Sequence, residues 1–535
     1  MTSELAAAES VAGVEPATEP SIAEAFARFQ EGRLADAETI CNAILTARPQ
    51  DFDSLHLLGL LRHRQGRNAE ALRLVAAVLR RAPRSAEVLS NYGLILTALK
   101  RHEEALACFE DALASDAGYL LALKNRAASL KSLGRHDEAL AAFAAVHAAR
   151  PDDIDVLNEC GGLLVRLGQI EAALACYDRA LALAPQVVEL QIKLWVNKGT
   201  AFAAACRFTD ALACFDAAIA IDPQCADAHH RASLIRLRSG DFKNGWRDFE
   251  WRWRTQWSPQ VRRVDAPLWR GEPIEGKTIL LLAEQGYGDT IQFIRYVPMV
   301  AALGAKVILD VPPPLQEIAL GIDGAAAVLR TDAPTPRVDY RCPLMSLPLA
   351  FATDLATVPA SVPYIQPSSE LVAEWHDRLS QTGRPRIGLC WAGSSAHLND
   401  HNRSIGLSRF AEILSLPDLH FVSVQREVDA EAQVILHRHG VVALGQDFES
   451  FSDTAAVLAE LDLLISVDTA VAHLAGAIGK PVALLLPYPA EWRWLTDRAD
   501  SPWYPSMRLF RQTAAGDWDA PLVRLHKELG LLAQR

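Results

Sequence analysis

Two different patterns of apolar and polar positions divide the chain. Over residues 21–256 the pattern repeats about every 34 residues, and each unit has the composition of a pair of amphipathic helices. From residue 277 onward, short apolar runs alternate with helical stretches, and Val482–Leu486 is one such run. Apolar runs of about five residues are typical of strands buried on both faces of a parallel sheet. The sequence therefore predicts an α-solenoid of about seven repeats followed by α/β domains.

The repeats of the first part share marker residues. A small residue is followed by an aromatic residue four positions later in five repeats, and a glycine precedes it by twelve positions in four repeats. One spacing is 38 rather than 34, and the extra residues, near 186–196, predict a lengthened helix or a loop. This pattern resembles the tetratricopeptide repeat (TPR), whose helix pairs stack into a superhelix with a concave surface. The small residues are Ala37, Ala71, Ala105, Ala139, Ala173, Ala211 and Gly245, and the glycines are Gly59, Gly93, Gly161 and Gly199.

The last repeat departs from the others because it is rich in tryptophan. Gly245 stands at the small-residue position, and Trp246, Trp251 and Trp253 follow it closely. A terminal repeat must either cap the stack or dock the next domain, and large aromatic residues favour docking. Such arrays mostly bind peptides or proteins in their groove. A rigid spacer or an oligomerisation surface is the alternative.

After a proline-rich linker, residues 257–276, the α/β part begins with a predicted strand at 277–282. The turn that follows contains Gly286 and Gly288, which allow the backbone to turn sharply, and Asp289 lies at the start of the next helix. Ligands of open α/β sheets bind at the carboxyl ends of the strands, so Asp289 is a candidate catalytic residue. Its alternative role is to cap the helix. We assign residues 277–382 to this domain.

A second α/β domain is predicted over residues 383–535. Its first strand ends at Gly393 and Ser394, and a polar segment containing Arg403 follows. The next strand ends at Gln425. Small and polar residues at strand ends again indicate a ligand-binding edge.

The most informative stretch is the strand, helix and strand within Leu461–Leu486. Thr469 occupies the position of a helix N-cap, and the helix would direct free backbone N–H groups towards a ligand above the strands. A nucleotide pyrophosphate fits such a place, with Asp468 and His473 beside it. The alternative is that Asp468 and Thr469 only cap the helix and that His473 is an ordinary surface residue.

Together these motifs resemble the heptosyltransferase-like (family 9) glycosyltransferases, which have the GT-B fold of two facing Rossmann-like domains. With the repeats in front, the chain resembles bacterial TPR–glycosyltransferase fusions, including those that modify flagellin. The resemblance implies that Asp289 is the general base and that the donor nucleotide sugar binds to the second domain. It also implies inverting, metal-independent transfer with no cofactor. The donor-binding residues that it implies are Gly393, Ser394, Arg403, Gln425, Asp468, Thr469, Ala470 and His473.

One position departs from the family pattern. Ala470 stands where the family has a glycine, which keeps the backbone N–H but reduces the space beside the pyrophosphate. The segments Glu491–Trp494 and Trp503–Pro505 resemble parts of the fusions, and packing is the favoured role for their aromatic residues. Asp517 and Asp519 have the spacing of a metal-binding D-x-D motif, but no predicted strand precedes them.

Composition excludes several classes. The net charge of −12 gives no indication of nucleic acid or anionic membrane binding. Nine scattered cysteines without a C-x-x-C motif indicate free thiols in a reducing compartment, so we expect a cytoplasmic protein. Residues 1–20 lack the features of a signal peptide and are expected to form a disordered tail. No apolar stretch is long enough to predict a membrane span.

Three functions remain open. The first is a glycosyltransferase whose TPR array recruits a protein acceptor, with flagellin as a candidate. The second is a TPR scaffold with a non-catalytic, nucleotide-sugar-binding GT-B domain. The third is a glycosyltransferase acting on a lipid-linked or lipopolysaccharide acceptor. The combination of Asp289, Arg403 and His473 favours an enzyme, because a protein that only binds needs no base.

Overall fold

The computed structural model describes residues 21–184, 187–256, 258–380, 383, 385–395, 397 and 399–533. The predicted disordered tail, residues 1–20, lies outside the described residues. The chain divides into two compact units, Met1–Ala201 and Phe202–Arg535. Among the described residues, no helix combines the length and the apolar character needed to cross a membrane.

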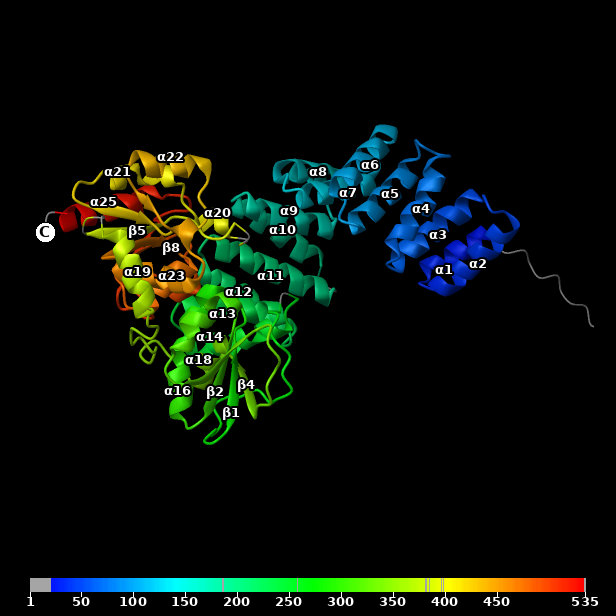
Figure 1. The fold of residues 1–535 in the computed structure, drawn as a ribbon. Helices are drawn as coiled ribbons and strands as arrows, with labels where there is room; N and C mark the ends of the chain where they lie inside the picture. The colour runs from blue at the N-terminus through cyan, green and yellow to red at the C-terminus, as the bar shows by residue number, and fades with distance from the viewer. Residues whose placement is uncertain are drawn as a thin grey trace, which may run out of the picture. The chain divides into compact units, whose positions relative to one another are not determined.

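The first unit consists of helices, and from α1 to α10 each helix packs against the next in sequence order (Figure 1). The first helices of the later repeats have 13 residues, as in α9, whereas α11 has 17. The four extra residues of this repeat therefore lengthen a helix rather than form a loop. The helices are α1 (Ile22–Gln30), α2 (Leu34–Ala47), α3 (Phe52–Arg64), α4 (Asn68–Leu79), α5 (Ala86–Ala98), α6 (His102–Ser115), α7 (Leu120–Ser132), α8 (His136–Ala149), α9 (Ile154–Arg166), α10 (Ile170–Leu183) and α11 (Val188–Ala204), the last of which continues into the second unit.

Glycines allow the two helices of a repeat to pack closely. A Cβ atom added at Gly93 would lie 2.7 Å from the Phe109 ring, and one at Gly161 would lie 2.6 Å from the Tyr177 ring. Both aromatic residues are buried. At these two glycines the first helix of the repeat therefore packs directly on the second.

The second unit begins with the last helices of the array, α12 (Phe208–Ile221), α13 (Ala226–Arg238) and α14 (Phe242–Phe249), and a 3₁₀ turn η1 (Glu250–Arg254). Trp246 of α14 is buried, and its ring meets those of Phe293, Trp492 and Trp503 edge-on, with centroids 6.2, 5.3 and 6.4 Å away. These three rings belong to the α/β part. The predicted docking role is therefore confirmed for Trp246.

The first sheet of the α/β part has four parallel strands in the order β3-β2-β1-β4. After the first strand, a 3₁₀ turn at Ile294–Tyr296 separates the helices Tyr287–Phe293 and Val297–Ala302. Pro298 lies in the first turn of the second helix, where the missing N–H is tolerated. The elements are β1 (Thr278–Leu282), α15 (Tyr287–Phe293), η2 (Ile294–Tyr296), α16 (Val297–Ala302), β2 (Lys306–Val311), η3 (Pro313–Leu315), α17 (Gln316–Leu320), β3 (Ala325–Arg330), β4 (Tyr340–Pro343), η4 (Leu344–Ser346) and α18 (Leu347–Ala350).

The second sheet has six parallel strands in the order β10-β9-β8-β5-β6-β7. Helix α19 lies within the range predicted for the first α/β domain, yet it packs on α23, where Trp375 donates a hydrogen bond to Asp453 over 3.2 Å. The elements are α19 (Ser369–Leu379), β5 (Arg386–Cys390), α20 (Asp400–Arg403), η5 (Leu407–Phe410), α21 (Ala411–Leu414), β6 (His420–Ser423), α22 (Ala430–Arg438), β7 (Val442–Ala443), η6 (Gly445–Asp447), α23 (Phe451–Glu460), β8 (Leu463–Val467), α24 (Ala470–Ala477), β9 (Val482–Leu486), η7 (Trp492–Trp494), β10 (Met507–Arg511) and α25 (Asp519–Ala533).

The strand order of both sheets indicates where a ligand would bind. In the first sheet β1 lies between β2 and β4, and in the second β5 lies between β6 and β8. Later strands are therefore added on both sides of each central strand, as in doubly wound sheets. Such sheets bind ligands at the carboxyl ends of these strands. The residues that follow β1, β5 and β8 are the ones that the sequence identifies as candidates.

The segment before β1, predicted as a linker, packs along the first sheet. Arg262 forms an ion pair with Asp310 on β2, with 3.0 Å between Nη2 and Oδ1. Trp269 is buried, and its backbone N–H donates to the carbonyl of Arg341 over 2.9 Å. The segment therefore covers the outer edge of β4.

Candidate functional site

Asp289 is at once a helix cap and one partner of an ion pair. Gly286 is the N-cap residue of α15, and its N–H donates to Oδ2 of Asp289 over 2.8 Å. The other carboxylate oxygen, Oδ1, accepts a hydrogen bond from Arg493. The capping role predicted as an alternative is therefore present, and the carboxylate also has a partner that the sequence analysis did not identify.

Arg493 is the centre of a buried polar cluster. It is 7% exposed, its Nε donates to Gln292 Oε1 over 2.5 Å, and its Nη1 lies 2.7 Å from Glu491 Oε1. Burial disfavours the charged guanidinium, but the carboxylates of Glu491 and Asp289 outweigh it and raise the pKa of Arg493. The guanidinium is therefore a permanent positive charge within the cluster.

Asp468, at the carboxyl end of β8, contacts two other parts of the site. Its side chain accepts a hydrogen bond from Trp494 Nε1 over 2.8 Å, and its backbone carbonyl accepts one from Arg403 Nη1 over 3.2 Å. Burial raises the pKa of Asp468, and the Trp494 hydrogen bond and the nearby arginines oppose that shift. Asp468 thus links the segment around Arg493 to the segment around Arg403.

Thr469 and His473 differ from their predicted settings. Thr469 does occupy the N-cap position of α24, but its hydroxyl makes no capping hydrogen bond and lies 3.3 Å from the Ser466 hydroxyl instead. His473 is only 5% exposed, with Nδ1 2.9 Å from the Tyr504 hydroxyl. The interpretation as a surface histidine is therefore wrong. Burial lowers the pKa of His473 far below its usual value, so the ring is neutral at neutral pH.

Gly288 allows the starts of α15 and α24 to touch. A Cβ atom at this position would lie 2.8 Å from Cδ2 of His473 and 3.6 Å from Cα of Ala470. Any larger residue would push the two helices apart. The glycine of the turn thus brings the loop that carries Asp289 next to the predicted nucleotide-binding helix.

The loop after β5 is covered by Arg403. A Cβ atom at Gly393 would lie 2.4 Å from Nη2 of Arg403, and the Gly393 N–H donates to the Ser404 hydroxyl over 3.0 Å. Arg403 also pairs with Asp400, with 3.1 Å between Nε and Oδ1. Ser394 is exposed. Arg403 therefore lies over this loop with part of its surface open to solvent, as a phosphate-binding arginine requires.

Gln425 is buried and holds the end of β5. Its Oε1 accepts hydrogen bonds from the Ala392 N–H over 3.1 Å and from the Cys390 thiol over 3.5 Å. The acceptor atom of this amide is therefore already used within the protein, and Gln425 supports the loop that carries Gly393.

A second buried arginine lies behind His473. Arg295 donates to the Pro359 carbonyl over 3.0 Å and to the Tyr364 hydroxyl over 2.9 Å. Its guanidinium carbon lies 4.5 Å from the centre of the Tyr504 ring. No carboxylate among the described residues forms an ion pair with it, and carbonyl groups, the Tyr364 hydroxyl and aromatic rings stabilise this charge.

The structure brings together Asp289, Gly288, Asp468, Ala470 and His473, and joins Arg403 and Gly393 to them through the Asp468 carbonyl. Sequence reasoning missed Arg493, Arg295 and Tyr504. A signal was available, because the runs of tryptophan, tyrosine and charged residues near Arg493 and Tyr504 are unusual in an otherwise apolar α/β part.

The described residues contain no group of three or more His, Cys, Asp and Glu side chains placed to hold a metal ion. In the D-x-D segment, Asp517 accepts a hydrogen bond from Thr513 over 2.8 Å, and Asp519 begins α25. These two carboxylates therefore belong to a turn and a helix start.

Comparison with known proteins supports the repeat assignment. Two family models, each described as tetratricopeptide repeat, match the chain, one at residues 56–119 and 196–244 and the other at residues 130–194. The N-terminal part is therefore a TPR solenoid, and parallel α/β sheets follow it. Protein FlbA of Caulobacter vibrioides is 26% identical over 321 residues, which cover 55% of this chain and 53% of FlbA. The chain thus matches about half the length of that curated relative.

Solved structures also resemble part of the chain, two of them described as TPR proteins. YrrB, described as a TPR protein with an unusual peptide-binding site, is 19% identical and covers 36% of this chain and 98% of its own, with a TM-score of 0.32. A TPR protein of Parabacteroides merdae is 18% identical. The match covers 43% of this chain and 89% of that protein, with a TM-score of 0.37. PilF of Pseudomonas aeruginosa is 19% identical. The match covers 39% of this chain and 94% of PilF, with a TM-score of 0.34.

Proposed function

We propose that the chain is a GT-B glycosyltransferase that moves a sugar from a nucleotide-sugar donor to a hydroxyl group of a protein acceptor held by the TPR array. The observation that carries the proposal is the contact between the two predicted site loops. The turn after β1, with Asp289, touches the start of α24, which follows Asp468 at the end of β8. Each loop lies at the carboxyl end of a central strand of a doubly wound sheet, where ligands bind.

In the proposed reaction, the acceptor oxygen forms a bond to the anomeric carbon while the bond to the nucleotide diphosphate breaks. Asp289 takes the hydroxyl proton. Arg403 and the backbone N–H groups at the start of α24 stabilise the negative charge of the departing diphosphate. Asp289 already accepts two hydrogen bonds, but a carboxylate offers about four acceptor sites, so an acceptor hydroxyl still has a place to bind.

A second candidate function is a TPR scaffold whose α/β part binds a nucleotide sugar without transferring it. The ion pair between Asp289 and Arg493 favours this alternative, because a carboxylate held by a buried arginine and by a helix N-terminus also serves as a purely structural link. Both functions include a protein partner in the TPR groove, since such arrays mostly bind peptides or proteins.

Donor binding is the first test. Thermal unfolding is measured with a panel of nucleoside diphosphates and nucleotide sugars, and a donor at about 100 times its Kd stabilises the protein by about 2.7 kcal/mol. Arg403→Ala is expected to weaken the binding of the nucleoside diphosphate more than that of the nucleoside, because its partner is phosphate. Arg409→Ala, which removes only an exposed ion pair, is the control. An equal loss for both ligands would assign Arg403 a structural role.

Transfer is the second test, and Asp289→Asn separates the two functions. The asparagine carbonyl oxygen can still accept the Gly286 N–H, so the helix cap is kept while the base is removed. We expect kcat to fall by about 10²–10⁴-fold, with nucleotide affinity nearly unchanged. Asp332→Asn, at an exposed carboxylate, is the matched control. Unchanged turnover in Asp289→Asn would exclude this residue as the base.

Recruitment is the third test. Removing residues 21–187, which end before α11, is expected to leave donor binding intact and to abolish modification of the native protein acceptor. Flagellin is one acceptor to test. Modification at the full rate by the shortened protein would make the array a spacer or an assembly surface.

A further inference from the structure

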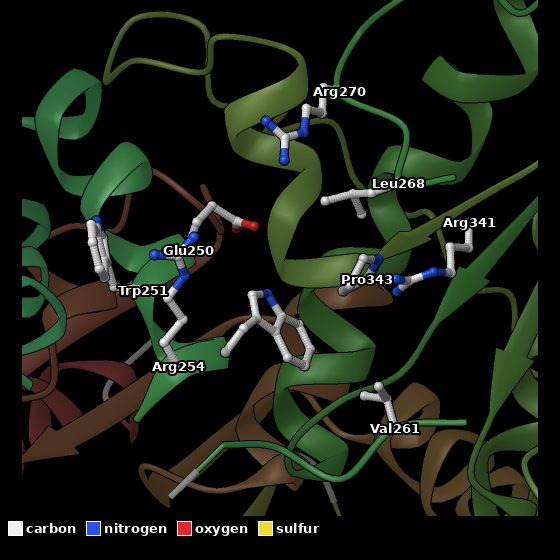
Figure 2. Close-up of a pocket in the computed structure, with 9 residues that line it drawn as sticks. Glu250, Trp251, Arg254, Val261, Leu268, Arg270, Arg341 and Pro343 are labelled. Atoms are coloured by element: carbon white, nitrogen blue, oxygen red, sulfur yellow. The ribbon is translucent and has the colours of Figure 1, made fainter. Parts of the chain in front are cut away.

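A cavity of about 480 Å³ lies in the second unit, lined by η1, by the segment before β1 and by the end of β4 (Figure 2). None of the residues of the Asp289 cluster lines it. Pro343, at the carboxyl end of β4, is part of its wall and is paired with Leu282, the last residue of β1. The cavity is therefore at the ligand-binding edge of the first sheet.

The wall of the cavity contains one carboxylate, Glu250, whose charge is already balanced by a neighbouring arginine. Glu250 accepts hydrogen bonds from Arg252 Nη1 over 2.7 Å and from the Ser346 hydroxyl over 2.8 Å. Arg252 is buried and also forms a two-point ion pair with Glu284, at 2.8 and 3.0 Å. This network fixes the wall and leaves Glu250 little capacity to attract a cation.

Three arginines line the cavity, and none of them forms an ion pair with a carboxylate among the described residues. Arg254 donates to a glutamine side chain and Arg341 to a backbone carbonyl. The guanidinium of Arg270 has no hydrogen-bond partner in the described part of the chain; Glu272 accepts the Arg270 backbone N–H, and this hydrogen bond, helped by the Arg270 charge, lowers the pKa of the Glu272 carboxyl. The residues that line the cavity include three arginines and one glutamate. The cavity is thus positive although the chain as a whole carries a charge of −12.

Aromatic rings form the apolar part of the wall. The Trp251 ring is stacked on His229, with a centroid distance of 4.2 Å and an angle of 4°, and Arg254 lies 4.8 Å from its centre. Arg252 lies 4.5 Å from the centre of the Trp253 ring. Both rings are therefore held in place before any ligand binds, which reduces the entropy lost on binding.

We propose that this cavity binds an acidic peptide segment, with carboxylate side chains on Arg270 and Arg341 and a neighbouring apolar side chain against Trp253 and Pro343. Figure 2 shows Arg254, Arg270 and Arg341 on different sides of the cavity. Such a distribution suits separate carboxylates, whereas a single phosphate group requires converging donors. Because the segment containing Leu268 already pairs with the edge of β4, the peptide inserts side chains rather than adding a strand.

The proposal concerns binding alone and does not depend on the proposed transferase activity. The probe is a fluorescein-labelled peptide with the central sequence Glu-Phe-Glu between glycine and serine residues, and its binding to the full chain is followed by fluorescence anisotropy at low salt. A peptide with Gln-Phe-Gln in its place is the comparison. We expect the acidic peptide to bind more tightly by about tenfold, and its affinity to fall as salt is added.

Arg270→Glu is the test variant, because this side chain is exposed and its loss breaks no described hydrogen bond. We expect it to lower the affinity for the acidic peptide by about tenfold or more, and Arg270→Gln to lower it less. Arg263→Glu makes the same charge change on an exposed arginine of the same segment outside the cavity, and its affinity is expected to stay within about twofold of the original value.

Three results would overturn the proposal. The first is no difference between the two peptides, and the second is an equal effect of Arg270→Glu and Arg263→Glu. The third is displacement of the peptide by adenosine monophosphate with the same dependence on Arg270, which would make the cavity a nucleotide site.

Discussion

Replacing Arg493 by methionine tests the polar cluster around Asp289 directly. Methionine keeps most of the aliphatic volume but removes the charge that contacts Asp289 and Glu491 and the donor to Gln292. Removing one partner of a buried ion pair costs about 3–5 kcal/mol, because the other charge stays buried. The Glu491 side chain is 36% exposed and keeps part of its hydration, so we expect the lower end, about 3 kcal/mol.

The assay is urea unfolding followed by circular dichroism and tryptophan fluorescence. Arg330→Met is the matched control, because it removes an ion pair with Asp332 in which both side chains are about half exposed. Such surface pairs contribute less than about 1 kcal/mol. Both substitutions lie in the second unit, so they are compared in the same transition.

The loss of stability caused by Arg493→Met also depends on pH, because Asp468 titrates in the same cluster. Burial raises the pKa of this carboxyl above its ordinary value, so the folded protein holds its proton more tightly than the unfolded chain does. The corresponding stability is present in acid and is lost as the pH rises through the native pKa. The charge of Arg493 opposes this shift. We therefore expect Arg493→Met to destabilise more near neutral pH than in acid, and a loss no larger than that of Arg330→Met would refute the reasoning.

Three glycine substitutions test the packing described above. Gly161→Ala is expected to destabilise by about 1–3 kcal/mol, because its Cβ would lie 2.6 Å from the Tyr177 ring, whereas Gly162→Ala, with its nearest neighbour at 3.9 Å, is expected to stabilise by up to about 1 kcal/mol. Thermal unfolding of the full chain distinguishes the two, and equal effects would contradict the close packing. Gly288→Ala is expected to lower the unfolding temperature of the second unit, because its Cβ would lie 2.8 Å from His473, and calorimetry that finds no change would show that α15 and α24 separate freely.

The repeats were predictable because each repeat solves the same packing problem locally. The contact of Gly161 with Tyr177 recurs as Gly93 with Phe109, so it appears in the sequence as a fixed spacing. The same reasoning did not decide whether the extra residues of α11 would lengthen a helix or form a loop. Only the stacking against neighbouring repeats decides such a choice.

The polar cluster was less predictable because its members are far apart in the chain. Asp289 and Arg493 are 204 positions apart, and no local pattern indicates which charges will meet. Thr469 shows the same limit at short range, since it occupies the N-cap position but its hydroxyl lies beside the Ser466 hydroxyl and makes no capping hydrogen bond. The strand Met507–Arg511 was missed because it is the last strand at one edge of its sheet and carries arginines at two of its five positions.

The inclusion of α12, α13 and α14 in the second unit separates two kinds of evolutionary freedom. Upstream of residue 201, whole repeats can be duplicated or deleted, because each helix pair needs only a similar neighbour. The final pair has no such freedom, since Trp246 is surrounded by rings from the α/β part. Array length is therefore expected to vary among relatives, while the residues around Trp246 change only in concert. A library that shuffles repeat number should leave this last pair untouched.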